Sequence, residues 1–161
     1  MTRFAILALG LVLGCDDGGD GTPIEPTSGV WGYLEGDIFD DSCRYADPVT
    51  SPMGTFTLTN HGDRTVSITP TGEAAFACTI SGASFTCPDR SNSDIPGAPL
   101  DATVRLHVTA YGTFSSPTAA TGHQRVDATC TGTQCDLAAA AVGVTFPCGF
   151  SVRYSASLVT R

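Results

Sequence analysis

The sequence predicts an all-β domain, an antiparallel up-and-down meander of about eight strands that closes into a barrel, with a β-sandwich as the alternative. Three observations lead to this fold class. From Gly29 onward, apolar and polar residues alternate with a period of two. Thr, Val and Phe, which favour strands, are abundant in this part of the chain. Turn residues recur at intervals of about 8 to 12 residues, as in sandwiches and barrels.

The alternation defines the individual strands. It is clearest in the longest of them, where Ala102, Val104 and Leu106 fall on one face while Arg105 and His107 fall on the other. One face is therefore expected to be buried and the other solvated. The predicted strands are Val30–Phe39, Thr55–Thr59, Thr65–Thr69, Ala74–Ile80, Ser84–Cys87, Ala102–Phe114, Arg125–Cys130 and Phe150–Leu158.

Three stretches lack a clear strand pattern. Asp89–Pro99 is polar with two prolines, which predicts a loop. Ser115–Gly122 is predicted as a shorter loop that follows the longest strand. Leu137–Thr145 consists of small and apolar residues, and periodicity alone leaves a short helix and a strand equally open.

The N-terminus has the layout of a secretory signal, with Arg3 followed by an apolar run and a small residue before Cys15. The run is too short for a membrane-spanning helix, which needs about 20 residues. The segment Val12-Leu13-Gly14-Cys15 resembles the lipobox of bacterial lipoproteins. The resemblance implies cleavage after Gly14, diacylation of the Cys15 thiol and acylation of the new N-terminus, with fatty acids such as palmitate.

This resemblance divides the chain into three parts: a signal peptide at 1–14, the lipidated cysteine with a flexible tether at 15–28, and the all-β domain at 29–161. The tether is predicted because its Gly, Pro and Asp residues cannot bury enough surface to fold. The implied location is the bacterial cell envelope, with the lipid in a membrane, more often the outer one, and the domain in the periplasm or on the cell surface. The membrane is then the first expected partner.

Charge excludes some functions. The chain has a formal net charge of −8, and the loss of Arg3 with the signal peptide lowers it to −9. This argues against nucleic acid as a partner. All eight basic residues are arginines, so the chain has no lysine for Schiff-base chemistry or for a phosphate-binding loop.

Cysteine usage predicts three disulfides. Once Cys15 is assigned to lipid, six of the seven cysteines remain. A two-residue type II′ turn at Gly82-Ala83 sets Ser81 opposite Ser84, and counting outward sets Cys78 opposite Cys87. The same count around Gly132-Thr133 pairs Cys130 with Cys135. By elimination Cys43 pairs with Cys148, which would tie the first strand to the last.

Gly29-Val30-Trp31 at the first strand resembles the Gly-x-Trp signature of lipocalins, which are small up-and-down barrels that carry apolar ligands. The resemblance implies a lipocalin-like barrel. It also implies that an arginine near the end of the barrel packs over the tryptophan, and Arg153 is the residue in that position. Trp31 and Arg153 are thus the candidate ligand-binding residues, while an ordinary core aromatic is the alternative for Trp31.

No residue pattern points to catalysis. The three histidines, His61, His107 and His123, lack metal-ligand spacing. His107 with Arg105 forms a polar stripe that is expected on the solvated outer face. Three carboxylates crowd the end of the first strand, where a charged turn is the favoured interpretation over a calcium or catalytic site. They are Asp37, Asp40 and Asp41.

We therefore expect a monomeric, non-enzymatic protein without catalytic residues, metal or cofactor. The leading hypothesis is a lipid-anchored structural or interaction module whose partner is another envelope protein. The alternative is a lipocalin-like carrier of a small apolar ligand. A cavity of a few hundred cubic ångströms with apolar walls would favour the carrier, and a filled interior would favour the module.

Overall fold

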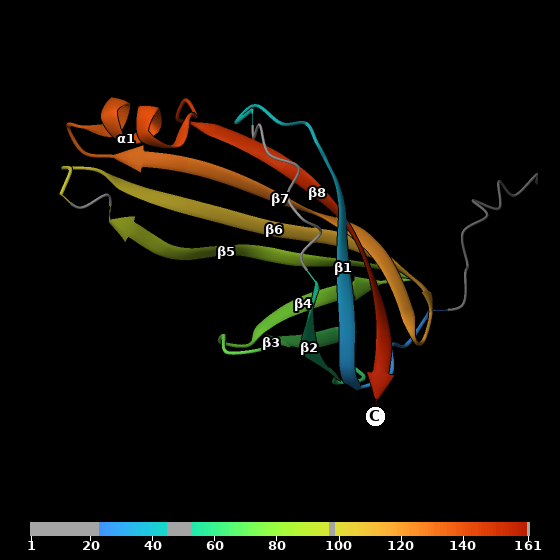
Figure 1. Ribbon diagram of the computed structural model, residues 1–161. Coiled ribbons are helices and arrows are strands. Elements are labelled where there is room, and N and C mark those ends of the chain that lie inside the picture. Colours follow the sequence, from blue (N-terminus) through green and yellow to red (C-terminus); the bar gives the residue numbers. More distant parts are fainter. Residues whose placement is uncertain (1–22, 45–52, 97–98, 161) are drawn as a thin grey trace, which may run out of the picture.

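The protein is a closed eight-stranded antiparallel barrel in which each strand pairs with its neighbours along the chain and β8 pairs with β1 (Figure 1). This computed structural model describes residues 23–44, 53–96 and 99–160. The predicted up-and-down barrel is confirmed over the sandwich. The elements are β1 (Gly29–Phe39), β2 (Met53–Asn60), β3 (Thr65–Pro70), β4 (Phe76–Ser81), β5 (Ser84–Pro96), β6 (Thr103–Ser116), β7 (Ala119–Thr131), α1 (Cys135–Val142) and β8 (Cys148–Thr160).

Strand β5 corrects the sequence prediction most. Asp89–Pro99 was expected to be a loop, yet β5 continues to Pro96 and pairs with β6 along this length. Register shifts between Cys87 and Arg90 and between Asn92 and Asp94 interrupt the pairing. Such bulges tolerate a proline, here Pro88, which cannot donate a ladder hydrogen bond. The prolines and polar residues of Asp89–Pro99 therefore predicted a loop, although most of this segment belongs to an irregular strand.

The connection between β6 and β7 is also shorter than expected. Ser115–Gly122 was predicted as a loop, but β6 ends at Ser116 and β7 begins at Ala119, so only Pro117 and Thr118 form the turn. The two strands pair from Thr103↔Thr131 to Ser116↔Ala119. This long hairpin forms much of the barrel wall.

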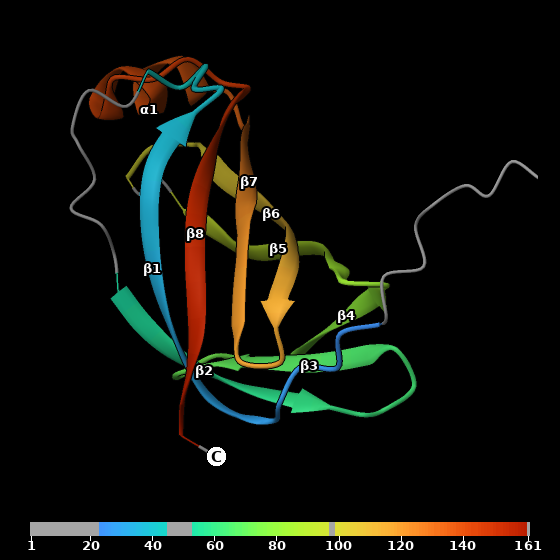
Figure 2. The same cartoon turned by 90° about the vertical axis from the view of Figure 1, so that its right-hand side faces the viewer.

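The ambiguous stretch at 137–145 is resolved as a helix over most of its length. Helix α1 begins at Cys135 and is ended by Gly143, whose φ of 75° is the left-handed conformation that glycine adopts without strain. The hairpin predicted around Gly132-Thr133 is therefore wrong, because Cys135 lies on the helix and not on a strand. Figure 2 shows α1 lying across one end of the barrel, beyond the upper ends of β1, β7 and β8.

Three disulfides join the same cysteine pairs that the sequence predicts: Cys43–Cys148, Cys78–Cys87 and Cys130–Cys135. In the β4–β5 hairpin, Ser81 pairs with Ser84 and Ile80 with Phe85, as the turn count requires. Gly82 has a φ of 60°, which fits the first position of a type II′ turn. The Cα atoms of Cys78 and Cys87 are 4.2 Å apart.

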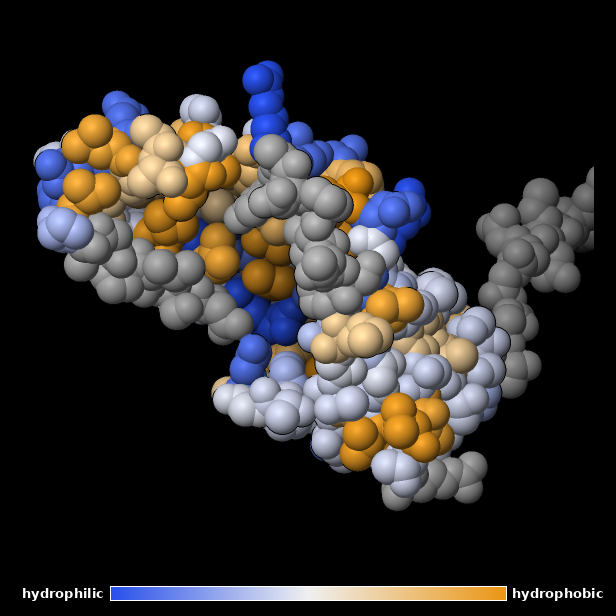
Figure 3. All heavy atoms as spheres, in the orientation of Figure 1, coloured by the Kyte–Doolittle hydropathy of each residue, from blue (hydrophilic) through white to orange (hydrophobic). Residues whose placement is uncertain are grey.

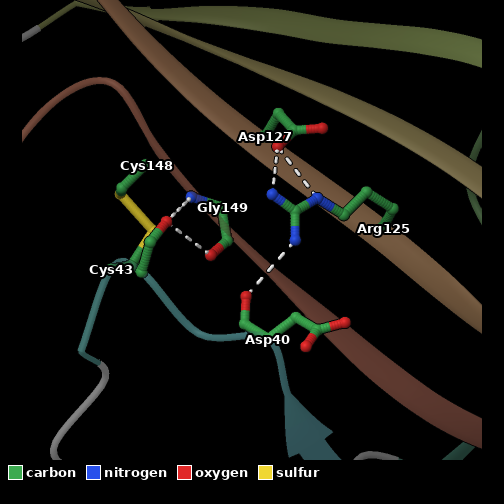
Figure 4. Close-up of polar contacts among 7 residues, drawn as sticks. Asp40, Cys43, Arg125, Asp127, Cys148 and Gly149 are labelled. Carbon is green, nitrogen blue, oxygen red and sulfur yellow. Dashed lines mark hydrogen bonds and ion pairs between the residues drawn. A yellow bond between two sulfur atoms is a disulfide. The ribbon is translucent and has the colours of Figure 1, made fainter.

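The Cys43–Cys148 bond fastens the end of β1 to the start of β8, and polar contacts reinforce this junction (Figure 4). The Ser42 hydroxyl donates to the Gly149 carbonyl at 3.1 Å and accepts from the Gly149 N–H at 2.9 Å. Arg125 donates to the Asp40 carbonyl at 3.3 Å and pairs with Asp127 at 2.7 Å. The barrel closure is thus covalent as well as hydrogen-bonded.

Buried residues form two clusters. The larger one contains Trp31, Leu58, Val66 and Phe114 and fills the end of the barrel opposite α1. The smaller one surrounds the Cys43–Cys148 bond near α1 and contains Ala128. A cavity remains beside the larger cluster, whose residues form part of its lining.

Residues 23–28, which were predicted as part of a flexible tether, instead lie against the closed end of the barrel. The indole N–H of Trp31 donates to the Thr27 carbonyl at 3.0 Å, and the Thr27 N–H donates to the Pro117 carbonyl at 2.8 Å. Pro26 is buried, and Ile24 packs against the larger cluster. The packed part of the chain therefore begins before Gly29.

Candidate functional site

The barrel contains a partly open cavity of about 230 Å³, to which all eight strands contribute. Figure 3 shows the face of the molecule hollowed between the part that carries α1 and the opposite part, with hydrophobic and hydrophilic surface together inside the hollow. The lining is mainly apolar, and its polar members come from four strands and one turn. The polar residues are Glu35, Glu73, Arg90, Gln124 and Tyr154.

The floor of the cavity is aromatic and aliphatic. Trp31 is fully buried, stacks on Phe56 with ring centroids 6.3 Å apart, and meets Phe114 edge-on at 6.2 Å. Leu58 and Val66 complete the floor with nearly no exposed surface. Since offset and edge-to-face contacts add to burial energy, this floor is a rigid apolar platform.

Two glycines make room for the rings that line the wall. Gly112 and Gly122 face each other on β6 and β7. A Cβ atom on Gly112 would lie 2.4 Å from the Phe85 ring, and one on Gly122 would lie 2.7 Å from the Tyr154 hydroxyl. Because both positions lack side chains, Phe85 and Tyr154 fold over them and shape the cavity.

Three of the five polar residues form a hydrogen-bonded chain above the apolar floor. The Arg90 Nη2 donates to Gln124 Oε1 at 3.1 Å, and the Gln124 Nε2 donates to Glu35 Oε1 at 3.4 Å. Glu35 lies two inward-facing positions beyond Trp31 along β1, with Tyr33 between them, so this chain lies apart from the Trp31 floor. The site is therefore amphipathic, apolar at its floor and polar above.

Arg90 is the strongest electrostatic feature of the cavity. Its guanidinium lies 4.1 Å from the centre of the Phe76 ring, a cation–π contact. Desolvation by burial lowers the pKa of Arg90, with Glu73 the main opposing charge. Among described residues no carboxylate lies within ion-pair distance of Arg90, and its Nε is buried without a hydrogen-bond partner.

Burial also acts on two acidic groups of the lining. It raises the pKa of Glu35, so this carboxyl takes up a proton at a higher pH than an exposed one. Burial raises the pKa of Tyr154 as well, and the Tyr154 hydroxyl donates to the Tyr111 carbonyl at 3.3 Å. Tyr154 therefore remains a neutral hydrogen-bonding group at physiological pH.

Of the two ligand-binding residues predicted from the sequence, the structure places one at the cavity. Trp31 lines it, as both a core aromatic and part of the floor. Arg153 does not pack over Trp31, and the expectation is wrong. Its side chain lies on the outer face, 4.7 Å from the centre of the Phe39 ring. Strand parity explains this, because the flanking residues Val152 and Tyr154 point inward. Cys15 lies outside the described residues.

Of the three carboxylates at the end of β1, Asp40 and Asp41 lie just beyond the strand, where a charged turn was expected. The Asp41 carboxylate accepts from the Arg44 N–H at 2.9 Å. Asp40 contributes its carbonyl to Arg125, and Asp37 is exposed on β1. These contacts order the chain around Cys43 and leave the carboxylates away from the cavity.

The histidines also lie apart from the cavity and from each other. His61 bonds Ser67 at 2.8 Å, and His107 bonds Asp89 at 2.8 Å on the outer face, where the polar stripe was expected. His123 packs between Phe39 and Tyr111. The described part of the chain holds no group of three or more metal-ligating side chains.

Sequence reasoning missed the polar residues of the cavity. Glu35 falls on the same alternate positions as the inward-facing Trp31 and Tyr33, and Tyr154 falls on those of the inward-facing Val152 and Ala156. A polar residue at an inward-facing position of a strand could therefore have been recognised from the sequence. The inward direction of Arg90 could not be predicted, because the bulge after Cys87 changes which residues of β5 face inward.

Comparisons with known proteins do not assign this chain to a family. No protein family matches it, and neither the curated proteins nor the solved structures show significant similarity to it. Within the described ranges, no helix is long and apolar enough to cross a membrane.

Proposed function

We propose that this protein is a lipid-anchored barrel that binds a small amphipathic molecule in its lumen and holds it at a bacterial membrane. The observation that carries the proposal is the unfilled lumen, with its apolar floor under a polar layer. A purely structural module gains nothing from such a space, since protein interiors pack densely and each void lowers stability.

The size of the cavity limits the ligand. Its volume of about 230 Å³ exceeds that of a dry cavity that binds benzene, about 150 Å³. It lies just below the range of about 300 to 1,000 Å³ typical of small-molecule pockets. A ligand with on the order of ten non-hydrogen atoms therefore fits.

The lining suggests how such a ligand would sit. An aliphatic or aromatic portion would contact Trp31, Phe56 and Phe114 at the floor, where each buried methylene contributes about 0.8 kcal/mol. A polar group at its other end would meet Arg90, Gln124 and Glu35. The ligand would then replace water in the apolar part while the polar part keeps its hydrogen bonds.

The predicted anchor supplies the location. Two or more acyl chains on Cys15 would make release from the membrane negligible. Residue 23 reaches the fold at its closed end, so the eight residues from Cys15 span at most about 28 Å. A tethered barrel of this kind would remain near the bilayer from which amphipathic molecules arrive.

Trp31 provides the test, because it is the single tryptophan of the chain and lies on the cavity floor. A bromoalkanol such as 6-bromohexan-1-ol carries a bromine that quenches indole fluorescence on contact. Titrating the oxidised full-length protein with this probe should give saturable quenching with one ligand per chain. Quenching that rises linearly without saturation would contradict the proposal and favour the interaction module.

A matched pair of variants locates the binding. Ala110 lines the cavity, and Ala110→Phe fills it, so saturable quenching should disappear. Ala77 is exposed on β4, and Ala77→Phe adds the same group outside the barrel, so quenching should remain. Circular dichroism of both variants checks that the barrel is intact.

A further inference from the structure

We infer that the ligand carries an acidic head group, a carboxylate, that binds the Arg90 guanidinium inside the barrel. This inference rests on the proposed function and adds the chemical class of the ligand. A neutral alcohol, an amine and an acid of the same length all fit the volume, and the charges of the lining decide among them.

The first step is the position of Arg90. The bulge between Cys87 and Arg90 turns this side chain into the lumen. Stacking on Phe76 and donation to Gln124 hold the guanidinium in place from two sides. A fixed guanidinium is a pre-organised site, because a planar fork of donors matches a carboxylate.

Within the described chain, the Arg90 side chain lacks an acceptor for one of its N–H groups and a carboxylate at ion-pair distance. Its Nε–H is buried and has no acceptor, and no carboxylate of the described chain pairs with its charge at short range. A partly buried charge with a buried N–H that has no acceptor costs stability, and natural proteins seldom leave such a group unsatisfied. An anion supplied by the ligand would provide both the missing acceptor and the missing charge.

Three acidic groups of the lining could oppose a bound anion. Glu35 bonds Gln124 at the end of the polar chain remote from Arg90, so its carboxylate opposes a bound anion only weakly. Glu73 lies on the β3–β4 turn, and its side chain is exposed at the rim. Tyr154 is neutral. Arg90 is thus the only cation of the described lining, and an amine would meet repulsion from it.

The experiment compares two probes that differ only in the head group, 6-bromohexanoate and 6-bromohexan-1-ol, by quenching of Trp31 at pH 7. The acid should bind at least tenfold more tightly than the alcohol, because charge-assisted hydrogen bonds are roughly twice as strong as neutral ones. Arg90→Met should remove this preference. Arg153→Met, which changes an arginine on the outer face, should retain it.

A second variant leaves Arg90 intact. Glu35→Gln removes the acidic group of the polar chain, so the affinity for the acid relative to that for the alcohol should rise severalfold. The Glu35→Gln variant therefore tests binding of the acid in the lumen even if Arg90→Met perturbs folding.

The outcomes separate the two proposals. If neither probe binds, the proposed function fails, and the inference fails with it. If the alcohol binds as tightly as the acid, the cavity is a binding site but the inference is overturned. The same holds if Arg90→Met keeps the preference or Glu35→Gln leaves the ratio of the two affinities unchanged.

Discussion

Glu35 and Arg90 lie in a barrel interior where apolar side chains would pack more favourably. Each is a charged group at partial burial, and the neutral Gln124 joins them. Polar residues in such positions reduce stability unless a partner compensates them. This cost is a physical reason to look for a ligand at these residues rather than for a structural role.

The raised pKa of Glu35 gives a pH prediction. A carboxyl whose pKa is higher in the folded than in the unfolded state binds more protons when folded, so the protein loses stability as the pH rises above about 4.3. Glu35→Gln has no carboxyl to lose a proton in this range. It should therefore raise the urea midpoint at pH 7 and leave it nearly unchanged below pH 4. An equal effect at both pH values would contradict the assignment.

Gly122 gives a packing prediction. An added Cβ would lie 2.1 Å from the Tyr111 carbonyl oxygen and 2.8 Å from the Gly112 Cα, both of them backbone atoms. Gly122→Ala should thus destabilise by about 1 to 3 kcal/mol in urea unfolding. Gly36→Ala is the control, because its nearest neighbours lie 3.8 Å away, and it should change stability by less than about 0.5 kcal/mol. Equal costs would argue against the close approach of β6 and β7.

At the scale of elements, regular strands were predictable and irregular ones were not. Alternation with a period of two defined β1 and β6, and a glycine turn fixed the register from Ser81–Ser84 outward. Bulges in β5 break that period, so its continuation past Cys87 and the inward direction of Arg90 were hidden. Helix α1 is only eight residues long and four of them are alanine, so it has no clear periodic pattern to detect.

The disulfides give a prediction at this scale, since they close loops of very different length. The chain separation is 105 residues for Cys43–Cys148 and 9 for Cys78–Cys87. By loop entropy the first should contribute about 4.7 kcal/mol and the second less than about 3 kcal/mol. All four cysteines are buried, so replacing each pair by alanine removes similar packing. Urea unfolding should show the larger loss for Cys43→Ala with Cys148→Ala, and the reverse order would contradict this account.

At the scale of the whole molecule, we propose a lipid anchor joined to a barrel that binds a ligand. The lipobox resemblance places the anchor on Cys15, outside the described residues. Cys15→Ser should move the protein from the membrane to the soluble fraction and remove the acyl mass, because the proposed anchor would account for membrane binding. Sedimentation and intact mass measure both. A Cys15→Ser protein that still sediments with membranes would contradict the lipoprotein assignment.

The overall shape was more predictable than the site. Closure of the barrel follows from alternation, which is a property of many residues together, and from the pairing of an early with a late cysteine. The site depends on single side chains, such as Arg90 turned inward by a bulge and Arg153 turned outward by parity. A sequence reveals the first kind of feature by repetition, whereas the second needs the register of every strand.

The most direct test of the central claim is native mass spectrometry of the full-length protein after incubation with 6-bromohexanoate. The account predicts a complex of one chain with one acid, which is retained by Ala77→Phe and lost in Ala110→Phe. Unliganded protein alone, or equal binding by both variants, would contradict the claim that the barrel lumen is a binding site.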